Sequence, residues 1–416
     1  MRAPTLALVL VAAALGSFGI AADAAPCPGF TLVPYQGPSC PVEGGWLVAL
    51  ADGTSVLTHG PDPAEPASVG VSIPPNPDPL PVSCAPAGTP RAQLMYAYPA
   101  DGVDRSATRV ETAKTYAEQA NAHVRAEAAA LGVSLRLSYA CGADGRPSVP
   151  IEHLGATAAA TSYSSIVNDL HARGYSDANT KYVVWYDGSV GGYCGQGAIF
   201  ADSRPGAANL NNRGDMFAIV YGCGWNVLLH ESGHTMGAVQ LDAQHTSGAF
   251  HCNDGNDIMC YADGGSRSDY SGTACAVGAP FDCGHDDYFD PAPAPGSYLA
   301  THWDVGAPAN RFLAFTPGCS AALHGTAADA ALATPVAVPP GCQGKFFSLT
   351  PGPDSALLVY ANAPASDYSV CWSAGAVTLR CDHMGATTYG AVPAAATSAT
   401  VSWTGGVPGD FLLAMG

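Results

Sequence analysis

The chain has 416 residues, with 34 acidic against 16 basic side chains and a formal net charge of -18. This balance argues against nucleic-acid binding, because phosphate contacts need clustered Lys and Arg. The length exceeds that of one typical domain, so we expect two or three compact units.

The first residues have the features of a secretory signal. Arg2 supplies a basic start, Leu6 to Leu15 form an apolar core, and Ala22-Asp23-Ala24 is a small-residue cleavage site. The apolar core is too short to cross a bilayer, which takes about 20 apolar residues, and no run of that length follows. We therefore expect residues 1–24 to be a signal peptide and the mature protein to be secreted and soluble, without a membrane partner.

The sequence contains 14 cysteines, all of them after the signal segment. An even number in an oxidising compartment predicts disulfides, whereas zinc binding by cysteine is disfavoured because no C-x-x-C pair occurs. Cys194 and Cys223 are expected to pair, which leaves Cys84 and Cys141 unassigned. Closeness in sequence predicts five further local bonds: Cys27–Cys40, Cys252–Cys260, Cys275–Cys283, Cys319–Cys342 and Cys371–Cys381.

Residues 25–90 are rich in Pro and Gly, with short apolar runs such as Gly45 to Leu50. This composition predicts a small β-rich N-terminal segment with one hairpin, followed by an extended Pro-rich linker over Pro61 to Pro90. Both a removable propeptide and a retained unit fit the segment.

Residues 91–315 are expected to form one α+β domain. Strand-like and helix-like apolar patterns alternate along it, which predicts a twisted sheet covered by helices. After the last of these helices the chain is irregular and rich in Gly, Asp, Ser and Pro, and we expect it to form the lower lip of a cleft. The expected strands are 93–98, 133–139, 181–186 and 218–221, and the expected helices are 108–131, 162–172 and 225–238.

Residues 316–416 alternate short Val, Leu and Tyr runs with Gly and Pro turns, for example Ala356 to Tyr360 and Ala399 to Trp403. That pattern predicts a small C-terminal β-sandwich.

The strongest chemical signal is the H-E-x-x-H sequence of His230-Glu231-Ser232-Gly233-His234, followed by Gly237. Positions i and i+4 of a helix share a face, so two imidazoles there can bind one zinc ion. Glu231 would then act as general base toward water, and Gly237 is suited to the left-handed end of the helix. The competing interpretation, two surface histidines and a salt-bridging Glu231, does not account for the methionine motif downstream.

That second motif is Asp257-Ile258-Met259-Cys260-Tyr261. H-E-x-x-H-x-x-G with such a methionine turn resembles the metzincin clan of zinc metalloproteases, over roughly residues 91–310. The resemblance implies Met259 as a hydrophobic base beneath the metal ligands, and Tyr261 facing the metal as in astacin-like and serralysin-like members. The segments 283–289 and 296–303 look like the tails of secreted actinobacterial-type proteins that share this motif.

The third zinc ligand departs from the family pattern. Metzincins place a His or Asp three residues after the glycine, where this chain has Gln240. A neutral amide oxygen is a weak zinc ligand, so we expect a nearby histidine to replace it. We predict His245, which lies in a loop able to fold back onto the metal. His251, beside Cys252, is the alternative, with Gln240 after it.

These features predict a secreted zinc endopeptidase of metzincin-like fold that acts as a monomer and binds an extended peptide along a sheet edge. The catalytic candidates are Glu231 and Tyr261, and the metal ligands are His230, His234 and His245. The alternative function is a catalytically inactive extracellular binding protein that contains zinc or is stabilised by disulfides.

Calcium is a second candidate cofactor. Asp254, Asn256 and Asp257 carry the oxygen ligands that calcium prefers, although an oxygen-rich turn is the commoner explanation of such a sequence.

Overall fold

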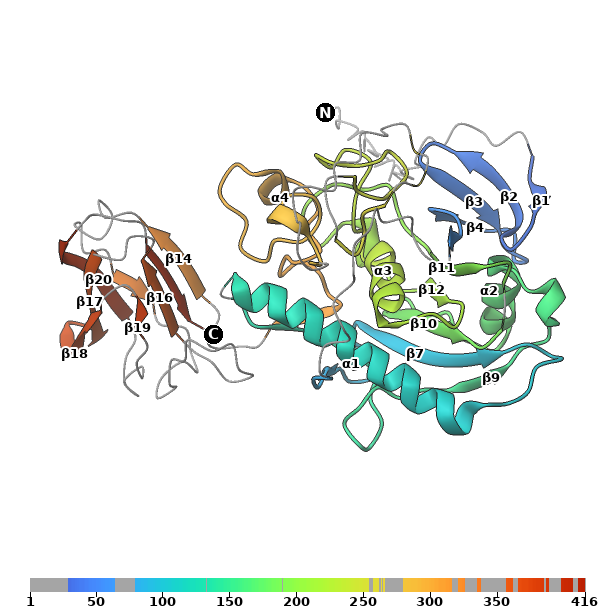
Figure 1. Ribbon diagram of the computed structural model, residues 1–416, viewed down its shortest axis with the longest axis horizontal. Coiled ribbons are helices and arrows are strands. Elements are labelled where there is room, and N and C mark those ends of the chain that lie inside the picture. The colour runs from blue at the N-terminus through green and yellow to red at the C-terminus, as the bar shows by residue number, and fades with distance from the viewer. Residues whose placement is uncertain are drawn as a thin grey trace, which may run out of the picture.

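The structure of the protein is a computed structural model (Figure 1). The expected signal peptide lies outside the described residues, as do Asp254 and Asn256 of the candidate calcium loop. The structure describes residues 29–63, 79–131, 133–188, 190–253, 257–261, 263, 265, 280–315, 321–325, 335–337, 357–361, 366–384, 387–388, 398–406 and 411–415.

A mixed sheet forms the centre of the larger unit in Figure 1. Its strands, in spatial order, are β13 (Leu313–Phe315), β8 (Leu135–Tyr139), β7 (Arg91–Tyr98), β10 (Thr180–Tyr186), β12 (Met216–Val220), β11 (Tyr193–Gly197) and β5 (Asp62–Pro63), with β6 (Ser83–Cys84) beside β8 and β9 (Ile151–His153) beside β7. Strands β7, β10 and β12 run parallel, and all seven residues of β10 are buried because both faces of the sheet are covered. Strand β11 is antiparallel to β12, and β5 pairs with β11 at that edge.

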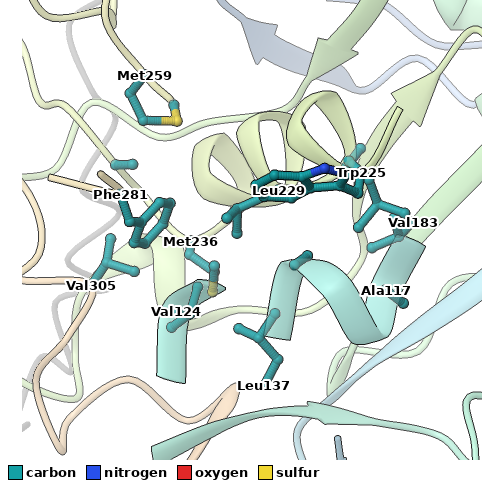
Figure 2. Close-up of a cluster of buried hydrophobic side chains, with 14 of the residues drawn as sticks. Ala117, Val124, Leu137, Val183, Trp225, Leu229, Met236, Met259, Phe281 and Val305 are labelled. Carbon is teal, nitrogen blue, oxygen red and sulfur yellow. The ribbon is translucent and has the colours of Figure 1, made fainter. Parts of the chain in front are cut away.

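Helices cover both faces of this sheet. Helices α1 (Ser106–Ala130) and α3 (Trp225–Thr235) share one buried cluster with the sheet, and Figure 2 shows Trp225 and Leu229 of α3 between the two helices. Helix α2 (Tyr163–Ala172) packs on the opposite face. Helix α3, which carries the H-E-x-x-H motif, is therefore held between α1 and the sheet.

The connecting segments contain short helical turns, namely η1 (Ala158–Ala160), η2 (Leu210–Asn212), η3 (Cys283–His285) and α4 (Tyr298–Thr301).

None of the helices in the described part of the chain combines the length and apolar character needed to cross a bilayer.

A four-stranded antiparallel sheet precedes the central one, with strands in the order β1 (Thr31–Val33), β2 (Gly37–Val42), β3 (Gly45–Ala49) and β4 (Ser55–Thr58). This N-terminal unit, residues 29–63, docks on helix α2. The backbone N–H groups of Tyr163 and Ser164 donate to the carbonyl oxygens of Tyr35 and Gln36 at 2.7 and 3.1 Å, and Val48 joins the cluster buried by α2. The chain then runs from β4 to β5 at the edge of the central sheet.

The described C-terminal residues form two antiparallel sheets, coloured orange to red in Figure 1. This agrees with the all-β pattern expected there, while the domain boundaries at residues 90 and 315 stay predictions. One sheet has β14 (Ala321–Gly325), β21 (Phe411–Met415), β16 (Leu357–Ala361) and β19 (Thr387–Thr388), and the other has β15 (Pro335–Ala337), β20 (Ser398–Gly406), β17 (Ser366–Ala374) and β18 (Val377–Met384).

The α+β class predicted from the sequence is confirmed, and each strand and helix expected between residues 91 and 238 is present with shifted ends. Helix α3 stops at Thr235 rather than at residue 238. Gly237 follows with φ of 86°, which confirms the left-handed end of the helix. Strand β11 is absent from the prediction because its sequence, Tyr-Cys-Gly-Gln-Gly, carries glycines that strands usually lack.

Three of the expected disulfides are present in the described residues, namely Cys194–Cys223, Cys252–Cys260 and Cys371–Cys381. Cys84 and Cys141, the two without an expected partner, bond to each other. Cys40 and Cys283 are also disulfide-bonded. Their expected partners, and the expected pair Cys319–Cys342, lie outside the described residues.

Lys181, on β10, ties the end of helix α3 to the sheet. Its buried ammonium donates to the carbonyl oxygens of Asn211, Arg213 and Thr235 at 2.9, 2.8 and 2.5 Å. Thr235 ends α3, and the last carbonyl groups of a helix have no partner within it. Burial lowers the pKa of Lys181 well below its usual value. The end of the motif helix is thus fixed by the hydrogen bonds of a buried lysine.

We expect Lys181→Met to destabilise the fold by about 2 kcal/mol, because it leaves buried carbonyl oxygens without their donor. Lys114→Met is the matched control, since Lys114 pairs with the exposed carboxylates of Glu111 and Asp144, whose contribution should be about 0–1 kcal/mol. Urea unfolding of both variants and the wild type measures the difference. Equal losses would contradict the role of Lys181.

Candidate metal centre and active site

Helix α3 places the motif side chains in the interior. Glu231 and His234 are 0% exposed, and His230 is 5% exposed. The Nε2 atoms of His230 and His234 lie 3.0 Å apart, so two ring nitrogens face one point. Nδ1 of His230 lies 2.6 Å from the carbonyl oxygen of Ile258, which makes Nδ1 the donor of that hydrogen bond.

His251 completes a group of three imidazoles. Its ring centroid lies 5.2 Å from that of His230 and 4.9 Å from that of His234. Its Nδ1 lies 2.8 Å from Oδ2 of Asp263, while its buried Nε2 has no hydrogen-bond partner among the described residues. A buried nitrogen without a hydrogen bond, next to two other imidazoles, is in the environment expected of a metal ligand.

The electrostatic surroundings favour neutral imidazoles at two of these positions. Burial, together with the neighbouring imidazoles, lowers the pKa of His234 well below its usual value, and burial lowers the pKa of His251. Burial also acts to lower the pKa of His230, but the carboxylate of Asp62 outweighs it and raises that pKa. Because zinc binds the neutral ring, His234 and His251 are in the form that a metal needs.

The structure separates His245 from these imidazoles, so the geometry does not support the sequence prediction that it is the third ligand. Its Nδ1 lies 3.2 Å from Oδ2 of Asp287, and it forms a separate group with Asp286 and Asp287. Its side chain is 37% exposed. The alternative, His251, lies beside His230 and His234, and the bond between Cys252 and Cys260 holds it next to the methionine turn.

Gln240 is also placed differently from a metal ligand. Its Oε1 accepts from the backbone N–H of Asp202 at 2.8 Å, and its Nε2 donates to the carbonyl oxygen of Gly237 at 2.9 Å. Gln240 therefore stabilises the loop that follows helix α3.

Met259 packs beneath helix α3. Its Sδ would lie 2.9 Å from a Cβ on Gly233, so the helix and the methionine turn meet where a glycine leaves room. Figure 2 shows Met259 as part of the same buried cluster. Asp257 accepts from the backbone N–H groups of Met259 and Cys283 at 2.8 and 3.3 Å, so this carboxylate is part of the methionine turn.

Glu231 is enclosed beside the imidazoles. Its Oε2 lies 3.2 Å from Nε2 of His59, and its Oε1 has no hydrogen-bond partner in the described part of the chain. Burial raises the pKa of Glu231 to about 7, with Asp62 adding to the rise and His59 opposing it. Strand β11 makes room for this carboxylate, since a Cβ on Gly195 would lie 1.9 Å from Oε1. A carboxyl that titrates near neutrality is suited to take up and return a proton.

Two residues that the sequence did not single out, His59 and Asp62, complete the site. Oδ2 of Asp62 lies 2.7 Å from Nε2 of His230, and the ring of His59 stacks on that of His234 with centroids 3.8 Å apart. Burial acts to lower the pKa of His59, but the neighbouring carboxylates raise it to about 10. Their only sequence signal is a His and an Asp three residues apart before a Pro-rich stretch, which does not distinguish them from turn residues.

The donor set fits a zinc ion. Three buried imidazoles lie together, with Nε2 of His230 3.0 Å from Nε2 of His234 and the ring centroid of His251 4.9 Å from that of His234. Two of the three are held through Nδ1 by an oxygen atom, as is usual where histidine binds zinc. The mixed sheet, the H-E-x-x-H helix and the methionine turn together resemble the corresponding parts of metzincin-like zinc proteases.

The family comparison agrees with this class. Residues 102–281 match the family described as Metallo-peptidase family M12B Reprolysin-like. The resemblance to metzincin metalloproteases predicted from the motifs is thereby confirmed. A comparison with curated proteins finds no match.

Among solved structures, metalloproteinase-II from Bacteroides fragilis is 16% identical with a TM-score of 0.22, over 47% of this chain and 52% of that one. This chain therefore spans about half of that structure. A catalytically inactive OgpA from Akkermansia muciniphila, in complex with an O-glycopeptide (glycodrosocin) substrate, is 9% identical with a TM-score of 0.30, over 82% of this chain and 97% of that one. Likenesses this low carry no argument about activity or substrate.

We expect Gly195→Ala to destabilise the protein by about 1–3 kcal/mol, because the new methyl group would lie 1.9 Å from Oε1 of Glu231. Gly155→Ala is the control, since the nearest atom there, Oδ2 of Asp169, would lie 3.7 Å away and the change should stay within about 0.5 kcal/mol. Thermal and urea unfolding measure both. A Gly195→Ala protein as stable as the control would contradict the close approach of β11 to the helix.

Proposed function

We propose that this protein is a secreted, zinc-dependent endopeptidase. The observation that carries the proposal is the proximity of the buried imidazoles of His230, His234 and His251 to one another, on and beside the helix that carries Glu231. The metallopeptidase family match supports the same class of enzyme. The signal-like N-terminal sequence and the disulfides support secretion.

The metal and the side chains have different roles in the proposed reaction. Zinc in this site would supply Lewis-acid polarisation of the peptide carbonyl. Glu231 takes a proton from the attacking water and then delivers it to the leaving amine, for which its raised pKa of about 7 is suited. The hydroxyl of Tyr261, whose ring centroid lies 4.3 Å from that of His251, donates to the negative charge that develops on the carbonyl oxygen.

The substrate is proposed to be an extended peptide. Strand β11 pairs with β12 on one side and with the two residues of β5 on the other. The edge of β11 that β5 occupies therefore accepts an added antiparallel strand. A peptide bound there would run past the carboxylate of Glu231, because Gly195 on β11 lies directly over its Oε1. The sheet edge would thus bind the peptide backbone, while helix α3 would contribute the catalytic carboxylate.

We expect Glu231→Gln to keep bound zinc and to lower kcat/KM for peptide hydrolysis by about 10²–10⁴, because the amide preserves the size of the side chain and removes the proton acceptor. Hydrolysis of a quenched fluorescent peptide library, with zinc measured by mass spectrometry in the same samples, gives both quantities. Unchanged hydrolysis would exclude Glu231 as the base.

We expect His251→Ala and His230→Ala to lose the zinc ion, of which about one per chain should be bound by the wild type. His245→Ala is the matched control and should keep it, because His245 lies with Asp286 and Asp287 instead. Zinc content after dialysis against a weak chelator makes the comparison. Loss of zinc from His245→Ala with retention by His251→Ala would reverse the assignment of the third ligand.

A further inference from the structure

We propose that Asp263 is the positioning residue of the third metal ligand. Its carboxylate holds the imidazole of His251 in the orientation and tautomer that bind zinc, and makes that ring a stronger ligand. The inference rests on the proposed function, because it concerns the metal site of that same enzyme. It accounts for how this chain supplies a third imidazole although Gln240 occupies the position that metzincins use.

The carboxylate of Asp263 contacts both sides of the turn that presents His251. Its Oδ2 lies 2.8 Å from Nδ1 of His251 and accepts from the hydroxyl of Ser247 at 2.6 Å. Its Oδ1 accepts from the backbone N–H of Gly265 at 2.8 Å. The side chains of His251 and Asp263 are 2% and 8% exposed, so water hardly competes for these bonds. Several donors around one carboxylate favour its ionised form.

This contact determines which nitrogen of His251 carries the proton. An ionised carboxylate accepts hydrogen bonds and donates none, so Nδ1 of His251 is the donor. In a neutral imidazole the lone pair is then on Nε2. That Nε2 is buried and has no hydrogen-bond partner among the residues that the structure describes. Asp263 therefore selects the tautomer whose Nε2 can bind a metal ion.

The three imidazoles of the site differ in what lies at Nδ1. That of His230 donates to a backbone carbonyl oxygen, and that of His234 is buried without a hydrogen-bond partner in the described part of the chain. Of the three, His251 alone has a carboxylate at Nδ1. A carboxylate raises the basicity of the imidazole that it contacts more than a neutral oxygen does. His251 is therefore the ring whose affinity for zinc depends most on its partner.

The backbone on either side of His251 is fixed independently of Asp263. The backbone N–H of Ser247 donates to the carbonyl oxygen of His251 at 2.7 Å, and Thr246 forms an antiparallel bridge with Cys252. Phe250 has a φ of 67°, which is uncommon for a bulky residue and persists where the surroundings hold it. The turn thus sets the position of the backbone, while the orientation of the His251 ring about its side-chain bonds is left to Asp263.

The experiment compares variants of the full mature chain. Asp263→Asn keeps the size of the side chain and removes its charge, and Asp263→Ala removes the acceptor. Asp215→Asn is the matched control, because Oδ1 of Asp215 lies 2.9 Å from Nε2 of His171 on helix α2, in a carboxylate–imidazole pair outside the site. The φ of 56° at Asp215 is one that asparagine adopts readily.

The first measurement is the dissociation constant for zinc, by competition with a chelating dye. We expect Asp263→Asn to bind zinc about tenfold more weakly and Asp263→Ala up to about a hundredfold more weakly, as when the outer partner of a ligating histidine is removed. Asp215→Asn should bind zinc as the wild type does. Urea unfolding of the metal-free proteins confirms that each variant is folded, and the near-isosteric Asp263→Asn serves if the alanine variant is not.

The second measurement reports on the His251 ring itself. In the cobalt(II)-loaded protein, the unpaired electrons shift the N–H protons of the ligand imidazoles far from all other proton signals. We expect one of these signals to disappear in Asp263→Ala, because its proton loses the acceptor and exchanges with water. The same signal should move in Asp263→Asn and keep its position in Asp215→Asn.

A further variant, Ser247→Ala, separates positioning of the ring from support of the turn. The Ser247 hydroxyl donates to Asp263 and accepts from the backbone N–H of Ala249 at 3.0 Å, so its loss weakens the turn but leaves the contact with His251 in place. We expect a lower urea midpoint for the metal-free protein, a retained N–H signal and a smaller loss of zinc affinity than in Asp263→Asn. A loss as large as in Asp263→Asn would overturn the positioning role.

The outcomes separate this inference from the peptidase. Unchanged zinc affinity and an unchanged N–H signal in both Asp263 variants would overturn the role of Asp263, while Glu231-dependent hydrolysis by the wild type would still support the peptidase. Weaker zinc binding by the Asp263 variants, with no peptide hydrolysed by the wild type, would support the role of Asp263 and overturn the peptidase. A wild-type chain that binds neither zinc nor cobalt would overturn both.

Discussion

A buried carboxylate among buried imidazoles is the constraint on which the rest of this structure depends. Removing such groups from water is costly unless each finds a polar partner, and Oε2 of Glu231 finds one in His59 at 3.2 Å. Strand β11 comes close enough because Gly195 carries no side chain there. Helix α3 is fixed at its C-terminal end by Lys181, and the methionine turn packs against the same helix at Gly233. Gly195 and the contacts of Lys181 with backbone carbonyl groups therefore determine the positions of strand β11 and helix α3 around the site.

Much of this arrangement is local in sequence, and that part could be predicted. The i and i+4 spacing of His230 and His234 places both rings on one helix face, and the apolar patterns locate the strands and helices of the central sheet. Cysteines close in sequence, such as Cys252 and Cys260, do bond. Two of the strands that the apolar patterns do not locate have an atypical composition, since β11 is rich in glycine and β5 is an Asp-Pro pair.

The rest depends on contacts between segments distant in sequence. His59 and Glu231 are 172 positions apart, and no local pattern relates them. The choice between His245 and His251 illustrates the same limit, because both follow the helix within a flexible-looking run of polar residues. Which of them faces the helix is decided by a disulfide beside His251 and by the carboxylate of Asp287 beside His245. Spacing along the chain carries no information on either.

The disulfide between Cys252 and Cys260 limits the compartments in which the site can form. His251 and Tyr261 are the immediate neighbours of the two bonded sulfurs, so the loop that presents them is closed by a bond that forms only under oxidising conditions. Under the proposed function, a chain held in a reducing cytosol would keep the helix histidines but lack a fixed third imidazole. Metal uptake would then follow export, and the producing cell would not contain the loaded enzyme.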